Sequence, residues 1–200
     1  MIYESRFWKN DLLKQAKSLR SRLTQKRWSE TSLARLEQTV MLGFYSIRKL
    51  IEAKKLSDSV ENQLIDTNLH SFKGEEVTRF NRDRIDELYS FDTVQSVTKD
   101  LIFFCNQFIH SYVFVIAFNE NSCVDGIFVS SDRERNKALY FIEIRKIIAL
   151  FEQVGNNYPS AVYMISDQKL GDYRILNLDS DDPDKDAKIQ KLHRQAGHEP

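Results

Sequence analysis

Four polar side chains interrupt one strongly apolar stretch of this chain: Asn106, Gln107, His110 and Ser111. Asn106 and His110 are four residues apart, so on a helix they lie one above the other on the same face. Gln107 and Ser111 form a second polar pair beside them. Because a buried polar group without a partner costs about 1–3 kcal/mol, these side chains either satisfy one another and the helix end, or line a site.

His110 can transfer a proton near neutral pH, because the unperturbed pKa of imidazole is about 6.5. Acid–base chemistry on a phosphate also needs a cation that stabilises negative charge. Arg48 is the first candidate because it borders the apolar stripe of an earlier helix, and its neighbour Lys49 is the alternative. The catalytic candidates are His110, Asn106 and Arg48. The candidates for binding are Gln107, Ser111 and Lys49.

The same residues also have a structural interpretation. His110 is expected near the C-terminal end of a helix, where its side chain can bond the last free carbonyl groups and a cation is favoured by the helix dipole. Ser111 then marks the exit into a strand. Arg48 and Glu52 have the i,i+4 spacing of a helical ion pair. The sequence leaves the structural and functional interpretations open.

The Asn-x-x-x-His spacing of Asn106 and His110 resembles the second half of the Arg-Asn-x-x-x-His signature of HEPN-type ribonucleases. These are small helical proteins common in bacterial toxin and phage-defence systems, in which the Arg and His act together on RNA, usually across a dimer interface. Cys105 stands where the family has its Arg, and the His-bearing helix here leads into predicted strands. The resemblance implies a metal-independent ribonuclease, with His110 as the acid–base group and Arg48 on the phosphate side.

Helical periodicity dominates the chain before this segment. Residues 8–23 and 33–55 each place apolar residues three or four apart, and together they predict an antiparallel helical pair. Gly43 lies in the middle of the second helix, where Gly costs about 1 kcal/mol relative to Ala, and a close helix–helix crossing would explain that cost. Residues 57–92 give a weak signal and predict a connector with short helical pieces.

The polar segment is predicted to end a third core helix. This helix is expected to begin near Asp92 or Thr93, because apolar residues from Val94 to Phe108 recur at steps of three or four. The period then changes, and β-branched and aromatic runs predict a β-hairpin followed by a third strand. These three runs are residues 112–118, 123–130 and 138–143.

A further helix is predicted from Ile144 to the break at Gly155, followed by two strands at 161–165 and 173–178. The predicted fold class is therefore α+β. It consists of an N-terminal antiparallel helical pair, a third core helix that leads into a small antiparallel sheet of about three to five strands, and one more packed helix.

The charges of the chain balance but are unevenly distributed. There are 29 Lys and Arg and 29 Asp and Glu residues, so the formal net charge is zero, which argues against a general polyanion binder. Basic residues crowd 9–27 and aspartates crowd 179–186, a pattern typical of a solvated helix face and a solubilising tail. We expect residues 1–178 to form one domain and 179–200 a charged tail, either disordered or a short free helix.

Several familiar classes of protein are disfavoured by what the sequence lacks. The six glycines are scattered singly, so there is no phosphate-binding loop. Cys105 and Cys123 lie too far apart for a zinc knuckle, and without a secretory segment we expect two buried thiols in a reducing compartment. The longest apolar stretch is too interrupted to span a bilayer. We therefore expect a cytoplasmic protein with no metal, no cofactor and no specific DNA-binding signal.

Taken together, these patterns favour a non-catalytic binding or interaction module, with a protein partner or self-association expected. The alternative is a HEPN-like metal-independent ribonuclease of the toxin or phage-defence type, which would bind RNA and use His110 with Arg48. A third interpretation lies between them. In this one, Asn106, Gln107 and His110 line a small-molecule pocket between a helix and the sheet.

Overall fold

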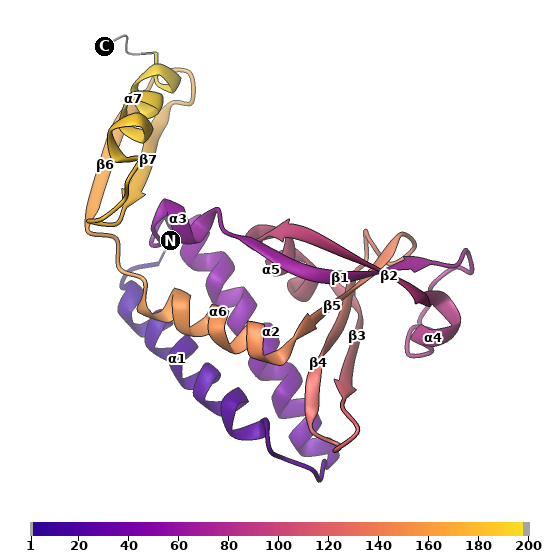
Figure 1. Ribbon diagram of the computed structural model, residues 1–200. Helices are drawn as coiled ribbons and strands as arrows, with labels where there is room; N and C mark the ends of the chain where they lie inside the picture. The colour runs from indigo at the N-terminus through magenta and orange to yellow at the C-terminus, as the bar shows by residue number, and fades with distance from the viewer. Residues whose placement is uncertain (1, 198–200) are drawn as a thin grey trace.

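Three long helices pack together on one side of the molecule in the computed structural model, which describes residues 2–197 (Figure 1). Helices α1 (Ser5–Arg22) and α2 (Glu30–Glu52) run antiparallel, and α6 (Ile144–Asn156) lies beside them. Helix α2 begins with a capping box, in which the Ser29 and Ser32 side chains each bond the other's backbone N–H. Such reciprocal caps satisfy donors that the first turn leaves free.

Close packing of aromatic rings holds α2 against its neighbours. The ring of Phe44 stacks on that of Phe108 with centroids 4.0 Å apart, and meets the edge of Phe151 at 5.5 Å. A Cβ placed on Gly43 would lie 2.1 Å from Cζ of Phe151, whose side chain is fully buried. Gly43 therefore allows a close helix–helix crossing, as its position predicts, and the partner helix is α6.

An antiparallel five-stranded sheet lies against these helices, with the strand order β2-β1-β5-β4-β3. Apolar residues of β4 and β5 face the same core cluster as the helices. The hairpin β3–β4, strand β5 and helix α6 lie where their sequence patterns predict. The strands are β1 (Leu64–Phe72), β2 (Tyr89–Asp100), β3 (Ser111–Phe118), β4 (Val124–Ser131) and β5 (Ala138–Glu143).

The third helix begins about eight residues later than its apolar spacing predicts. Val94 and Val97 lie on β2, and helix α5 spans Leu101–Ile109. The side chain of Asp100 caps this helix, since its Oδ1 accepts a hydrogen bond from the Phe103 N–H at 2.6 Å. The β-branched residues of this segment favour an extended chain, and pairing with β1 outweighs the helical spacing. The prediction of a helix start near Asp92 was therefore wrong.

Residues 57–92, which were predicted as a connector with short helical pieces, also contain strand β1. The short pieces are present as α3 (Asp58–Glu61) and α4 (Ile85–Leu88), but β1 lies between them, paired with both β2 and β5. Two of its buried positions are polar, Thr67 and His70. They are satisfied by main-chain carbonyl groups, of Phe141 for Thr67 and of Ser90 for His70. Polar residues at buried positions removed the apolar alternation that would have revealed the strand.

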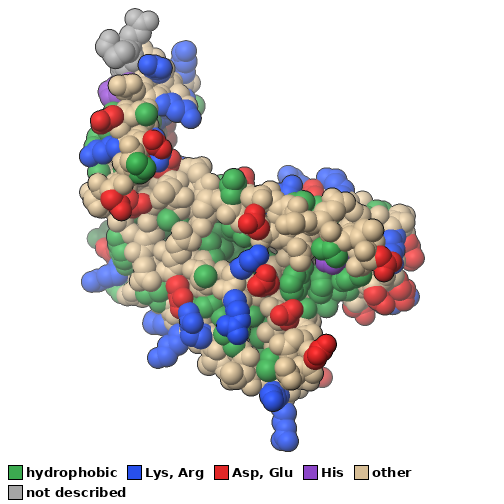
Figure 2. Space-filling model, viewed as in Figure 1, with side chains coloured by type: hydrophobic (Ala, Val, Ile, Leu, Met, Phe, Trp, Pro, Cys, Tyr) green, Lys and Arg blue, Asp and Glu red, His purple; other side chains and the backbone are tan. Residues whose placement is uncertain are grey.

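A separate two-stranded sheet and one helix project from the rest of the molecule (Figures 1 and 2). Strands β6 (Ala161–Asp167) and β7 (Asp172–Leu178) form a hairpin, and helix α7 (Lys185–Gln195) packs on it. Helix α7 lies within the segment that was predicted as a charged tail. The last residues of that tail, 198–200, lie outside the described part of the chain. No helix within residues 2–197 is both long and apolar enough to cross a bilayer.

Lys9 is buried, although its sequence context places it on a solvated basic helix face. Its side chain is only 1% exposed. Its Nζ donates hydrogen bonds to the main-chain carbonyls of Lys55, at 2.8 Å, and of Asn157, and lies 4.2 Å from the ring centroid of Tyr158. Lys9 thus joins α1 to the ends of α2 and α6. Burial lowers the pKa of Lys9 from 10.5 to about 8, and repulsion from Lys55 adds to this effect.

This lowered pKa makes the stability of the protein depend on pH. Between about pH 8 and 10.5, folded Lys9 has released its proton while the unfolded chain still holds one, so the free energy of unfolding rises with pH. From pH 7.5 to 9.5 we expect wild type to gain about 1–2 kcal/mol relative to Lys9→Met, measured by urea unfolding. The matched variant Lys17→Met, on the exposed face of the same helix, should keep the wild-type slope. Parallel curves for wild type and Lys9→Met would contradict this role.

Candidate functional site

A cavity of about 500 Å³ opens where α2, α5 and the β4–β5 loop meet. Its volume falls in the range of pockets that hold small ligands. Four of the residues predicted from the sequence line this cavity: Arg48, Asn106, Gln107 and His110. The loop after β4 supplies the opposite wall, with charged side chains that the sequence did not single out.

Arg48 is held at the cavity wall by two partners. Its Nε donates to Oε1 of Glu52 at 2.8 Å, and its Nη1 donates to Oδ1 of Asn106 at 2.9 Å. A guanidinium has five N–H donors, so these two bonds leave others for a ligand. Hydrogen bonds from Lys49 and from Arg48 hold the pKa of Glu52 below its usual range. The ion pair predicted from the spacing of Arg48 and Glu52 is therefore present, and Asn106 fixes the guanidinium against α5.

His110 ends helix α5 through its main chain, while its side chain stays free. Its N–H donates to the Asn106 carbonyl at 3.1 Å, and its own carbonyl accepts from the Asp132 N–H at 3.0 Å. The imidazole is exposed and has no hydrogen-bond partner within residues 2–197. The interpretation of His110 as a side-chain cap is therefore wrong, and its ring is available at the cavity.

Gln107 has a structural role. Its side chain is buried, and its Oε1 accepts a hydrogen bond from the Ser131 N–H at 2.8 Å. This bond ties α5 to the end of β4, at the point where the cavity wall begins. Of the polar pair Gln107 and Ser111, only Gln107 reaches the cavity, because Ser111 lines a different surface hollow together with Arg82 and Tyr112.

Lys49 points away from the cavity. Its Nζ donates to Oε2 of Glu52 at 2.8 Å and lies 5.7 Å from the ring centroid of Tyr45. The hydrogen bond to Glu52 raises the pKa of Lys49 above its usual value. Lys49 lines another hollow on the far side of α2, beside Trp8. The structure therefore brings Arg48, rather than Lys49, to the Asn106–His110 segment.

The charged turn between β4 and β5 contributes three residues to the cavity: Asp132, Arg133 and Glu134. The first forms an ion pair with Arg135 at 3.3 Å, and the third with Lys137 at 2.9 Å. Arg133 is exposed and has no ion-pair partner within residues 2–197. The pairing of β3 with β4 places this turn beside the end of α5, because Ser131 lies opposite Ser111, the residue after His110.

The cysteine next to Asn106 in the sequence, Cys105, is unreactive. Cys105 follows Phe104 in the core, and burial raises the pKa of its thiol to about 12. A thiol in this environment stays protonated and unreactive at neutral pH. In the described part of the chain there is no group of three His, Cys, Asp or Glu side chains that could hold a metal ion.

The cavity thus combines three side chains on an α+β scaffold. Arg48 is held by two partners, whereas Arg133 has no ion-pair partner and the His110 ring has no hydrogen-bond partner within residues 2–197. Comparison of the chain with protein-family models, with curated proteins and with solved structures gave no match.

Gln107 and His110 should respond differently to substitution. Gln107→Leu leaves the buried Ser131 N–H without an acceptor, so we expect a loss of about 1–3 kcal/mol in the free energy of unfolding. His110→Ala removes an exposed ring without a partner and should stay within about 0.5 kcal/mol of wild type. Urea unfolding of both variants measures this difference. An equal loss in the two would show that His110 also supports the fold.

Proposed function

We propose that this chain is a binding module, and that the cavity beside Arg48 holds a small anionic ligand of nucleotide size. The observation that carries this proposal is the fixed guanidinium of Arg48, which Glu52 and Asn106 hold at 2.8 and 2.9 Å. A guanidinium positioned in advance loses little side-chain entropy when it binds a phosphate or carboxylate. The expected protein partner or self-association remains a prediction.

The charge balance of the cavity favours an anion. Its two acidic residues, Asp132 and Glu134, each have a basic partner, Arg135 and Lys137 respectively. Arg133 has no such partner within residues 2–197 and is exposed at the rim. Arginine binds phosphate and carboxylate groups through two parallel hydrogen bonds, so Arg133 beside Arg48 suits a ligand with more than one anionic oxygen.

An aromatic wall favours a ligand with a planar part. Phe103 lines the cavity, and its ring is held edge-on by Tyr140 at a centroid distance of 4.9 Å. The Lys99 ammonium lies 5.1 Å from the centroid of the Phe103 ring. Nucleobases stack on aromatic rings whatever their sequence. A nucleoside monophosphate would place its base near Phe103 and its phosphate near Arg48.

Calorimetric titration tests this proposal with adenosine monophosphate and inorganic pyrophosphate as probes. We expect one binding event per chain for at least one probe, and a roughly tenfold weaker affinity for Arg133→Gln, because one charge-assisted contact is lost. Arg145→Gln, an exposed arginine on α6 outside the cavity, is the matched control and should bind as wild type does. Absence of binding, or an equal loss in the two variants, would contradict an anion site here.

A second function is supported by one specific observation: His110 and Arg48 line the same cavity, and Asn106 bonds the arginine directly. In metal-independent RNA cleavage, a base removes the proton of a 2′-hydroxyl, whose oxygen attacks the adjacent phosphorus. The 5′-oxygen leaves and takes up a proton, and a cyclic phosphate remains. His110 would transfer the proton, and Arg48 would stabilise the negative charge on the non-bridging phosphate oxygens.

RNA cleavage is tested with single-stranded RNA in the presence of a metal chelator. A ribonuclease should cleave as wild type and lose at least about a hundredfold in rate as His110→Ala, in line with the usual contribution of acid–base groups. The thermal melt of the variant should match wild type, because the ring has no partner within residues 2–197. Intact RNA with wild-type protein would leave binding as the function of the cavity.

A further inference from the structure

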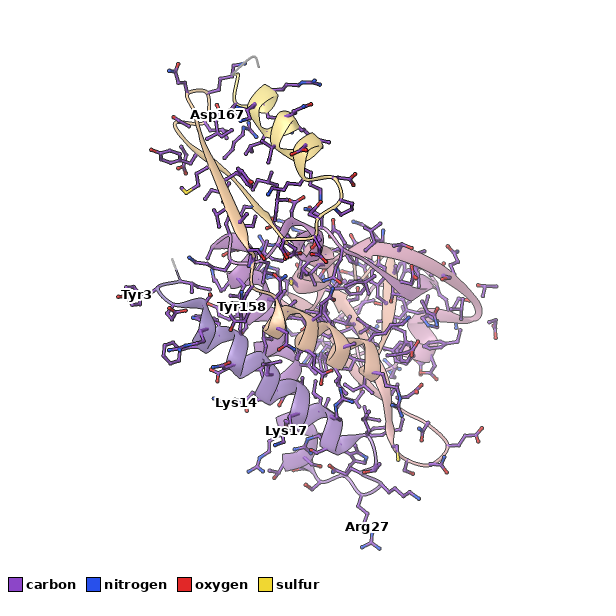
Figure 3. The ribbon with its side chains drawn as sticks, turned by 60° about the vertical axis from the view of Figure 1, so that its left-hand side comes forward. Tyr3, Lys14, Lys17, Arg27, Tyr158 and Asp167 are labelled. Carbon is purple, nitrogen blue, oxygen red and sulfur yellow. The ribbon has the colours of Figure 1, made fainter. Side chains whose placement is uncertain are left out.

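A second cavity, of about 390 Å³, lies where the β6–β7 hairpin meets the helices. Its walls come from the start of α1, the end of α2 and one face of the hairpin. It shares no lining residue with the cavity beside Arg48. Figure 3 shows Tyr158, one of its lining residues, at the foot of the hairpin beside the start of α1. Nothing in the proposed function uses this cavity.

Asn177, which lines the cavity, connects the hairpin to the helices. Asn177 on β7 is 4% exposed, and its Nδ2 donates hydrogen bonds to the main-chain carbonyls of Lys54, at 2.8 Å, and Leu56, at 3.0 Å. These two acceptors fix the orientation of the amide. Its Oδ1 is buried and has no hydrogen-bond partner within residues 2–197. This oxygen is closed off from solvent, so the Asn177 amide holds the hairpin against the end of α2 and contacts no ligand directly.

Lysine side chains give the same cavity a positive charge. Lys9, Lys54 and Lys55 all line it. Lys54 forms an ion pair with Glu61 at 2.5 Å, whereas Lys55 has no ion-pair partner within residues 2–197. The low pKa of Lys9, about 8, reflects the burial of one of these cations and its repulsion from Lys55. An anion in the cavity would lower this repulsion.

The third wall is apolar and open. Val162 and Met164 project from the face of β6 opposite to the face that packs on α7, and they are 58% and 56% exposed. Ile175, directly across from Met164 on β7, continues this surface into the cavity. Exposed apolar side chains that gather beside a polar rim mark binding sites more often than single ones do.

We propose that this cavity binds a small amphipathic anion. Lys55 faces the anionic group, and Met164 and its neighbours cover the apolar body of the ligand. The two features are complementary, because the lysine without an ion-pair partner within residues 2–197 attracts an anion, and the exposed apolar face of β6 contacts apolar surface.

The probe 8-anilinonaphthalene-1-sulfonate has both features, an aromatic body and a sulfonate. We expect fluorescence titration of the full chain to show one saturable site. Met164→Glu, which places a negative charge in the cavity, should weaken binding at least tenfold. The matched control is Leu170→Glu at the hairpin tip, which is 58% exposed, makes the same change of charge and lies outside the cavity. It should bind as wild type does.

A second pair of variants tests the charge without touching the apolar wall. Lys55→Gln should weaken binding about fivefold to tenfold, while Lys17→Gln on the outer face of α1 leaves it unchanged. Equal weakening in each matched pair, or binding without saturation, would show non-specific adsorption and overturn the proposal. A dimer in sedimentation that Met164→Glu separates, together with no probe binding to wild type, would assign this face to a second copy of the chain and also overturn it.

Discussion

The stacking of Phe44 on Phe108 fixes the relation between α2 and α5, and the candidate site depends on that relation. The two rings are nearly parallel, with an angle of 7° between their planes. Arg48 lies one turn after Phe44, and Asn106 lies just before Phe108, so the same register that stacks the rings brings the guanidinium to the amide. A helix displaced by a single residue would turn Arg48 toward solvent, because neighbouring residues on a helix point in different directions.

Local sequence patterns predict many of the helices and strands around the site. They do not predict contacts between elements that lie far apart in the sequence. Helical spacing identified α1, α2 and α6, and the polar pair Asn106 and His110 stood out because it interrupts an apolar run. The later part of β2, residues 92–100, was predicted as a helix because a few apolar residues on this exposed edge strand fall three or four apart. Arg133 reaches the site because β4 pairs with β3, which follows α5 directly, and the residues around Arg133 do not show which side chains it will face.

Buried polar groups explain the other differences between the sequence patterns and the structure. Lys9, Thr67 and Gln107 are each polar residues whose side chains lie in the interior, and each bonds the main chain of a distant element. The type of a polar residue does not reveal whether its side chain forms hydrogen bonds with water or with a carbonyl group of a distant element. In this protein such bonds join α1 to the end of α2, β1 to β5, and α5 to β4. The polar residues thus connect elements that the apolar core alone would leave free to slide.

The projecting hairpin is a small cooperative unit with few connections to the rest of the molecule. A two-stranded sheet is marginal on its own, so β6 and β7 depend on α7 over one face and on a few bonds at their base. Among these are the Asn177 amide bonds and the bond between Ser59 and Asp179 at 2.8 Å. Units attached in this way open more readily than the core that carries them. A ligand bound at the base of the hairpin would therefore reduce the motion of the whole hairpin, without any change in the positions of the strands.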